Sequence, residues 1–181
     1  MSVAAFASYL MVFMLSLTPV EQHAYYERAE VTTARYVDIS QSLAQVMLEQ
    51  PMPDAERVKV GAIMVLIGNE ESHWNEASVS CAKGGDNGKA WGPWQTQLPK
   101  ENVCRGVAPA ARLAVEMVKQ SFLACKHLPP PGRLSWYTDG GSWNVSPSRR
   151  ARAFKRSEWR MTRALSWVKE HPFADALNET P

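Results

Sequence analysis

The chain has 181 residues, of which 45% are hydrophobic and 21% charged, so it is expected to fold as one domain with a real core. Its formal net charge of +2 hides an uneven distribution, because residues 1–100 carry 7 Lys/Arg and 11 Asp/Glu (−4), whereas residues 101–181 carry 13 and 7 (+6). These values exclude a disordered polar chain, and the basic C-terminal half suggests an anionic partner: nucleic acid, a membrane surface or a cell wall.

Residues 4–17 form an apolar run that only Ser8, Tyr9 and Ser16 interrupt. The run is short for a membrane span of about twenty residues, but it suits the core of a signal peptide. No Lys or Arg precedes it and no clear cleavage site follows it, so a helix packed on the domain is a third option. We therefore divide the chain into a hydrophobic segment, 1–20 (signal, anchor or packed helix), and a domain, 21–181. Membrane association through residues 4–17 stays open.

The spacing of apolar residues predicts four further helices, over residues 21–50, about 55–71, about 109–126 and about 148–170. The second of these is apolar nearly all round from Val58 to Ile67, which places it at the centre of the domain. Between it and the third helix lies a segment with Gly84, Gly85, Gly88 and Gly92. The expected fold class is mainly α, with a small irregular or β element around residues 76–98.

The three cysteines, Cys81, Cys104 and Cys125, have no zinc-site spacing. Cys104 and Cys125 are the first pair to consider for a disulfide. A helix over 109–125 would be about 24 Å long, however, and a five-residue lead-in reaches at most about 17 Å. The redox state therefore stays open.

The buried second helix ends in Glu70-Glu71-Ser72. A carboxyl group at this place loses hydration and faces the negative end of the helix dipole, and both effects favour its protonated form. A carboxyl group that keeps its proton near neutral pH is what a general acid needs. The alternative is that both Glu residues end a helix in solvent, and position alone favours that alternative.

The residues that follow favour the first interpretation. They read Glu71-Ser72-His73-Trp74-Asn75, then Ala77-Ser78-Val79-Ser80, then Gly85-Asp86-Asn87-Gly88-Lys89-Ala90-Trp91-Gly92-Pro93-Trp94-Gln95. This order resembles the transglycosylase SLT and goose-type lysozyme pattern over about 25 residues, and a Tyr137…Gly140-Gly141 segment extends it. The resemblance implies an α+β lysozyme-like domain over 21–181 that cleaves the peptidoglycan bond between N-acetylmuramic acid and N-acetylglucosamine.

When the family's residue roles are carried over by matching position, the resemblance implies that Glu71 is the catalytic acid/base and that Ser72 orients it. Gln95 and Tyr137 become cleft residues that contact the sugar. Adjacent helix positions point about 100° apart, so Glu70 and Glu71 cannot both face the cleft, and the motif selects Glu71.

Three features depart from the family pattern. Pro93-Trp94 stands where Leu-Met usually precedes the Gln, and Tyr137-Thr138-Asp139-Gly140-Gly141 holds one residue more than Tyr-x-Gly-Gly. Gln97 stands near the place of a goose-type Asp. Asp86 is the candidate second carboxylate, and a turn Asp that bonds its own backbone is an equal alternative.

With one firm carboxylate, a lytic transglycosylase that forms a 1,6-anhydro product is favoured over a hydrolase, and two-carboxylate hydrolysis stays open. The resemblance also implies a periplasmic, envelope, extracellular or virion-associated location, and we expect neither metal nor cofactor. Two other classes of function remain. A virion or secretion-apparatus component could bind glycan without cutting it. A nucleic-acid-binding protein would depend on the basic residues 149–163, which are more typical of a solvated helix face, so no nucleic acid is expected as partner.

Overall fold

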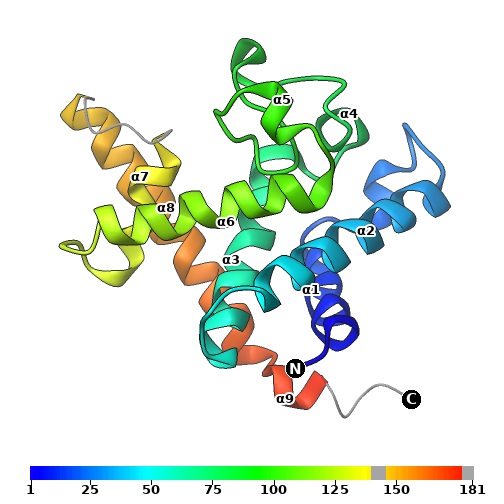
Figure 1. Ribbon diagram of the computed structural model, residues 1–181, viewed down its shortest axis with the longest axis horizontal. Coiled ribbons are helices and arrows are strands. Elements are labelled where there is room, and N and C mark those ends of the chain that lie inside the picture. The colour runs from blue at the N-terminus through cyan, green and yellow to red at the C-terminus, as the bar shows by residue number, and fades with distance from the viewer. Residues whose placement is uncertain (140–145, 177–181) are drawn as a thin grey trace.

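The computed structural model describes residues 1–139 and 146–176, and within these ranges the chain is mainly helical, as predicted (Figure 1). The segment around residues 76–98 is irregular. Its only β features among the described residues are two isolated antiparallel bridges, Gly85 to Ala90 and Trp91 to Thr96. The segment also holds the short helix α4 (Glu76–Val79) and the 3₁₀ turn η2 (Asp86–Gly88). The sequence predicted either irregular structure or a small β element here, and the structure shows irregular structure.

Helix α3 (Asp54–Ser72) lies at the centre of the molecule (Figure 1). Pro53 precedes it, and Asp54 and Glu56 in its first turn suit the positive end of the helix dipole. Every residue from Val60 to Gly68 is buried. The prediction of a central helix over 55–71 is therefore confirmed.

Helix α1 (Val3–Leu17) packs against α3 and against α2 (Ala29–Leu48). The contact with α3 is close, because a Cβ at Gly61 would lie 2.8 Å from the ring of Phe6. Tyr9 and Phe6 also contact Phe173 of the terminal helix α9 (Phe173–Ala176). Residues 3–17 thus form a helix that is packed on the rest of the domain in this structure. The 3₁₀ turn η1 (Val20–His23) joins α1 to the chain before α2.

Among the described residues, no helix combines the length and the apolar character that crossing a membrane requires.

Helix α8 (Pro147–Glu170) packs against α3, and helix α6 (Val107–Ala124) packs against α2 (Figure 1). The short helix α7 (Ser135–Thr138) follows the 3₁₀ turn η3 (Pro130–Leu134) and packs between α6 and the first half of α8. This packing brings α3, α7 and α8 together at the C-terminal end of α3.

A disulfide joins Cys81 to Cys104, with 5.8 Å between their Cα atoms, and Cys125 is free and buried. Cys104 therefore does not pair with Cys125, the first partner that the sequence suggested for it. Cys104 directly follows the short helix α5 (Lys100–Val103), on the N-terminal side of α6, and Cys125 lies at the other end of α6. The 18 residues of α6 therefore separate them, whereas the irregular segment folds back to bring Cys81 close.

Candidate functional site

The chain leaves α3 through two residues in the left-handed region, His73 with φ 49° and Trp74 with φ 55°. This turn folds the Trp74 ring back onto α3, where it lies over Gly68. A Cβ at Gly68 would lie only 1.9 Å from that ring, so only glycine fits at this position. Trp74 is fully buried, and Glu71 is left at the rim of the helix end with 28% of its side chain exposed.

Trp94 fixes the segment that carries Gln95. Its indole Nε1 donates to the carbonyl of Met64 on α3 at 2.9 Å, and its ring meets Trp74 edge-on with 6.1 Å between centroids. The Trp94-Gln95 pair therefore rests directly on the helix that carries Glu71. Gln95 has φ 45° and donates from its side chain to the carbonyl of Gly92 at 2.8 Å, which holds this turn closed.

Tyr137 on α7 reaches the same place from the other side. Its hydroxyl donates to the carbonyl of Trp94 at 3.0 Å, and its backbone N–H donates to the hydroxyl of Ser121 on α6 at 3.0 Å. Burial, together with the nearby charge of Glu71, raises the pKa of Tyr137 well above that of a free tyrosine. Tyr137 is therefore a neutral hydrogen-bond donor at any ordinary pH.

These three segments enclose a small cavity of about 170 Å³. Glu71, Gln95 and Tyr137, three of the residues singled out in the sequence, lie together in its wall. Glu70 is not among the lining residues, in agreement with the expectation that only one of the two adjacent carboxylates faces a cleft. The remaining lining residues are Trp94, Thr96, Gln97, Met117, Thr138 and Arg156.

Two buried hydroxyls in this wall have no hydrogen-bond partner among the described residues: Oγ1 of Thr96, on a side chain that is almost wholly buried, and Oγ1 of Thr138. A buried hydroxyl without a partner loses the energy of hydration and gains nothing in return. A ligand or water that carries its own hydroxyl or carbonyl groups would satisfy both. The cavity is therefore suited to a polar molecule.

Glu71 does not stand alone, because Arg160 of α8 binds it. The guanidinium of Arg160 is almost wholly buried and donates to the carboxylates of both Glu71 and Glu70. Burial lowers the pKa of Arg160, but the two carboxylates more than offset this and raise it overall. The sequence predicted a proton-bearing carboxyl at position 71, whereas in the structure that group accepts from a cation.

Arg160 was missed by the sequence argument, which placed it with the solvated arginines of residues 149–163. Arg160 is buried, so that prediction is wrong for this residue, whereas Arg149 is more than half exposed although it pairs with Asp139. The helical spacing held a signal that could have found Arg160. It belongs to the inward stripe of α8, which consists of Ala153, Ser157, Arg160, Met161 and Ala164.

Ser72 and Asp86 lie close to the cavity but do not line it. The Ser72 hydroxyl donates to the carbonyl of Gly68 at 2.9 Å and accepts from the N–H of Trp74 at 3.1 Å, so it shapes the end of α3. No hydrogen bond joins it to Glu71 among those of the described residues. Asp86 has φ 46°, begins the η2 turn and accepts from the Gln97 side chain at 3.0 Å. Gly140 and Gly141 lie outside the described residues.

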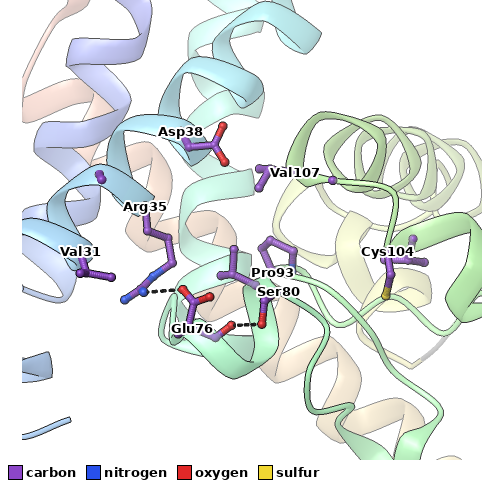
Figure 2. A pocket seen from close by; sticks show the side chains of 12 residues that line it. Val31, Arg35, Asp38, Glu76, Ser80, Pro93, Cys104 and Val107 are labelled. Atoms are coloured by element: carbon purple, nitrogen blue, oxygen red, sulfur yellow. Dashed lines mark hydrogen bonds and ion pairs between the residues drawn. The ribbon is translucent and has the colours of Figure 1, made fainter. Parts of the chain in front are cut away.

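A larger cavity of about 460 Å³ lies elsewhere, between α2, α4 and the start of α6 (Figure 2). Arg35 lies in its wall, but its guanidinium is already occupied by Glu27, by Glu76 at 2.9 Å and by the carbonyl of Trp74 at 2.7 Å. Arg35 thus anchors the turn after α3 from outside the Glu71 cavity. Size alone would select this larger cavity, but the chemistry-bearing residues line the smaller one.

Within the described ranges, no three His, Cys, Asp or Glu side chains gather in a way that could hold a metal ion. Comparisons with models of protein families, with curated proteins and with solved structures gave no match.

Proposed function

We propose that this chain is a peptidoglycan-cleaving enzyme of the lytic transglycosylase or lysozyme type, with Glu71 as its acid/base. The observation that carries the proposal is the meeting of Glu71, Gln95 and Tyr137 in one cavity, from segments up to 66 positions apart in the chain. These are the residues that the motif resemblance selected. The partnerless hydroxyls of Thr96 and Thr138 in the same wall suit a ligand as rich in hydroxyl and amide groups as a glycan.

In the mechanism that the resemblance implies, the Glu71 carboxyl gives its proton to the glycosidic oxygen. The bond from C1 to that oxygen breaks, and the acetamido oxygen of N-acetylmuramic acid bonds to C1. The Glu71 carboxylate then takes the proton of the C6 hydroxyl, and O6 displaces the acetamido oxygen from C1. The product is a 1,6-anhydro sugar, no water is consumed, and Glu71 ends as it began.

The buried guanidinium of Arg160 is compatible with this cycle because it binds Glu70 as well as Glu71. When Glu71 takes up a proton or turns toward the substrate, the guanidinium keeps the carboxylate of Glu70 as its partner. A buried arginine with Glu71 alone would lose its only counter-ion at that step. Glu70 is therefore the residue that holds Arg160, and Glu71 is the residue free to exchange partners.

Asp86 does not line the cavity, and it binds Gln97, which does. This favours the one-carboxylate route over hydrolysis, since a water-activating carboxylate has to reach the sugar. The disulfide between Cys81 and Cys104 fits a protein of an oxidising compartment, so we place the chain in the periplasm, the envelope or outside the cell, including on a virion.

The test is digestion of purified sacculi. Wild type should release 1,6-anhydro muropeptides, which are lighter by one water than hydrolysis products in mass spectrometry, and Glu71→Gln should release none. Glu70→Gln is the matched neighbour and should retain measurable activity. A Glu71→Gln protein that still digests sacculi contradicts the proposal.

A second candidate is a non-catalytic glycan-binding component of a virion or secretion apparatus. The observation that favours it is the ion pair between Glu71 and Arg160, which holds the candidate acid in a charged contact. The same assay separates the two functions. Wild type that binds sacculi and releases no muropeptides supports the binding component.

A further inference from the structure

A second cavity, of about 250 Å³, adjoins the Glu71 cavity. It lies between the end of α7 and the first half of α8, and its wall consists of Thr138, Asp139, Arg149, Arg152, Ala153 and Arg156. Thr138 and Arg156 line both cavities. A ligand that occupies the Glu71 cavity and extends toward the N-terminal end of α8 therefore enters this second cavity.

The charge of the second cavity is positive. The guanidinium of Arg149 donates to the carboxylate of Asp139 and, at 3.4 Å, to the backbone carbonyl of the same residue. The charges of Arg149 and Asp139 therefore cancel. Arg152 and Arg156 are one helical turn apart and therefore share a face. Within residues 1–139 and 146–176, no ion pair involves either of them, so two guanidinium groups remain available.

Two guanidinium groups beside a buried hydroxyl are suited to an anion. A planar guanidinium donates two parallel hydrogen bonds to a carboxylate, and such charge-assisted bonds are the strong ones in proteins. The Thr138 hydroxyl, buried and without a partner in the described part of the chain, supplies a third donor between the two cavities. The glycan proposed above carries carboxylates at regular intervals, either on the lactyl groups of its muramic acid units or on its stem peptides.

We propose that the cavity lined by Arg152, Arg156 and Thr138 binds a carboxylate of the glycan strand, and so fixes which sugar ring lies next to Glu71. This inference rests on the proposed function for the identity of its ligand. A neutral strand of N-acetylglucosamine lacks the carboxylate and should bind less tightly. Arg152 and Arg156 would thereby make the site selective for muramic-acid-containing strands.

The experiment measures the binding of the full chain to three ligands at fixed ionic strength. These are neutral N-acetylglucosamine hexamers, peptide-free strands that an amidase has released and that keep lactyl carboxylates, and intact sacculi. Three proteins are compared: wild type, Arg152→Gln, and Arg163→Gln as the control. Arg163 lies on the same helix with the same charge, but it is exposed against Trp159 with its guanidinium carbon 5.1 Å from the ring centroid.

Wild type should bind the peptide-free strands more tightly than the neutral hexamers, by about ten-fold or more. This is the gain in affinity expected from one hydrogen bond to a charged group. Arg152→Gln should lose most of this preference and bind the hexamers as wild type does. Arg163→Gln should keep it. Tighter binding to intact sacculi than to peptide-free strands, again dependent on Arg152, assigns the carboxylate to the stem peptide. Weaker binding to intact sacculi, where the lactyl carboxyl is amide-bonded to the peptide, assigns it to the lactyl group.

Equal losses in Arg152→Gln and Arg163→Gln overturn the inference, because they indicate unspecific attraction. A separate measurement with duplex DNA also overturns it if the chain binds DNA tightly and Arg152→Gln abolishes that binding. The enzymatic function and the carboxylate site can fail separately. If wild type releases muropeptides and Arg152→Gln does not change strand binding, only the carboxylate site is excluded. Arg152-dependent binding without muropeptide release removes only the enzymatic function.

Discussion

The guanidinium of Arg160 binds the carboxylate of Glu71, which precedes it by 89 positions in the chain. Glu70 accepts from the same guanidinium, so the second half of α8 is tied to the end of α3 by one cation and two carboxylates. Breaking a buried ion pair by removing one partner leaves the other charge without compensation, which costs more than the pair contributes.

Arg160→Met should therefore destabilise the protein, by about 2 to 4 kcal/mol, since the two carboxylates remain about one quarter exposed and water compensates them in part. Urea unfolding followed by circular dichroism measures this. Arg163→Met, at an exposed position of the same helix, should change stability by less than about 0.5 kcal/mol. Adding Glu70→Gln and Glu71→Gln to Arg160→Met should restore much of the loss, and no recovery would contradict the ion-pair explanation.

Gly68→Ala should also destabilise the protein, although Gly to Ala in a helix interior is ordinarily stabilising by about 1 kcal/mol. The added methyl group would lie 1.9 Å from the Trp74 ring, so the ring has to move, at a cost of about 1 to 3 kcal/mol. The comparison is made in a double-mutant cycle with Trp74→Ala. In that background Gly68→Ala should be neutral or stabilising, and a persistent penalty would mean that something other than Trp74 opposes the methyl group.

Loss of the disulfide between Cys81 and Cys104 should cost about 3 kcal/mol, the chain-entropy value for a cross-link at a sequence separation of 23. Thiol titration of the unfolded protein checks the pairing directly. Of three cysteines, one should react without reductant and three after reduction. Cys125→Ala should leave no reactive thiol without reductant, and any residual thiol would show that the assigned pair is not formed.

The cluster of His23, Glu27 and Arg35 should make stability fall in acid. Burial, and then the charge of Arg35, lowers the pKa of His23, so the unfolded chain binds its proton more readily and stability declines as pH falls below about 6.5. The hydrogen bond from Arg35 lowers the pKa of Glu27, whose contribution is complete above about 4.5 and is lost as pH falls through its folded value.

Melting temperatures between pH 7 and pH 3 measure both effects. The decline between pH 7 and pH 5 should be smaller in His23→Gln than in wild type. The decline below pH 4.5 should be smaller in Glu27→Gln, which is less stable at neutral pH because it loses the charge-assisted bond to Arg35. Parallel profiles for wild type and both variants would exclude this cluster as the origin of the acid sensitivity.

The sequence determined where the long helices lie and which of them is central, although the helix predicted over 21–50 begins only at Ala29. Apolar residues at the three/four spacing located α2, where Tyr36, Ile39, Leu43 and Met47 are all buried. The unbroken apolar run of α3 placed that helix inside, because such a helix has no face suited to water. The local motif also selected Glu71, Gln95 and Tyr137, and these three side chains line one cavity.

Only the tertiary structure decided the partners of these residues. Arg160 looks like one more cation of a basic helix until α8 packs on α3, where its guanidinium is buried between two carboxylates. The pairing of Cys81 with Cys104 depends in the same way on how the irregular segment folds back. Periodicity reports one helix at a time, whereas ion pairs, disulfides and cavities arise where elements distant in the chain meet, and no local pattern encodes which elements those are.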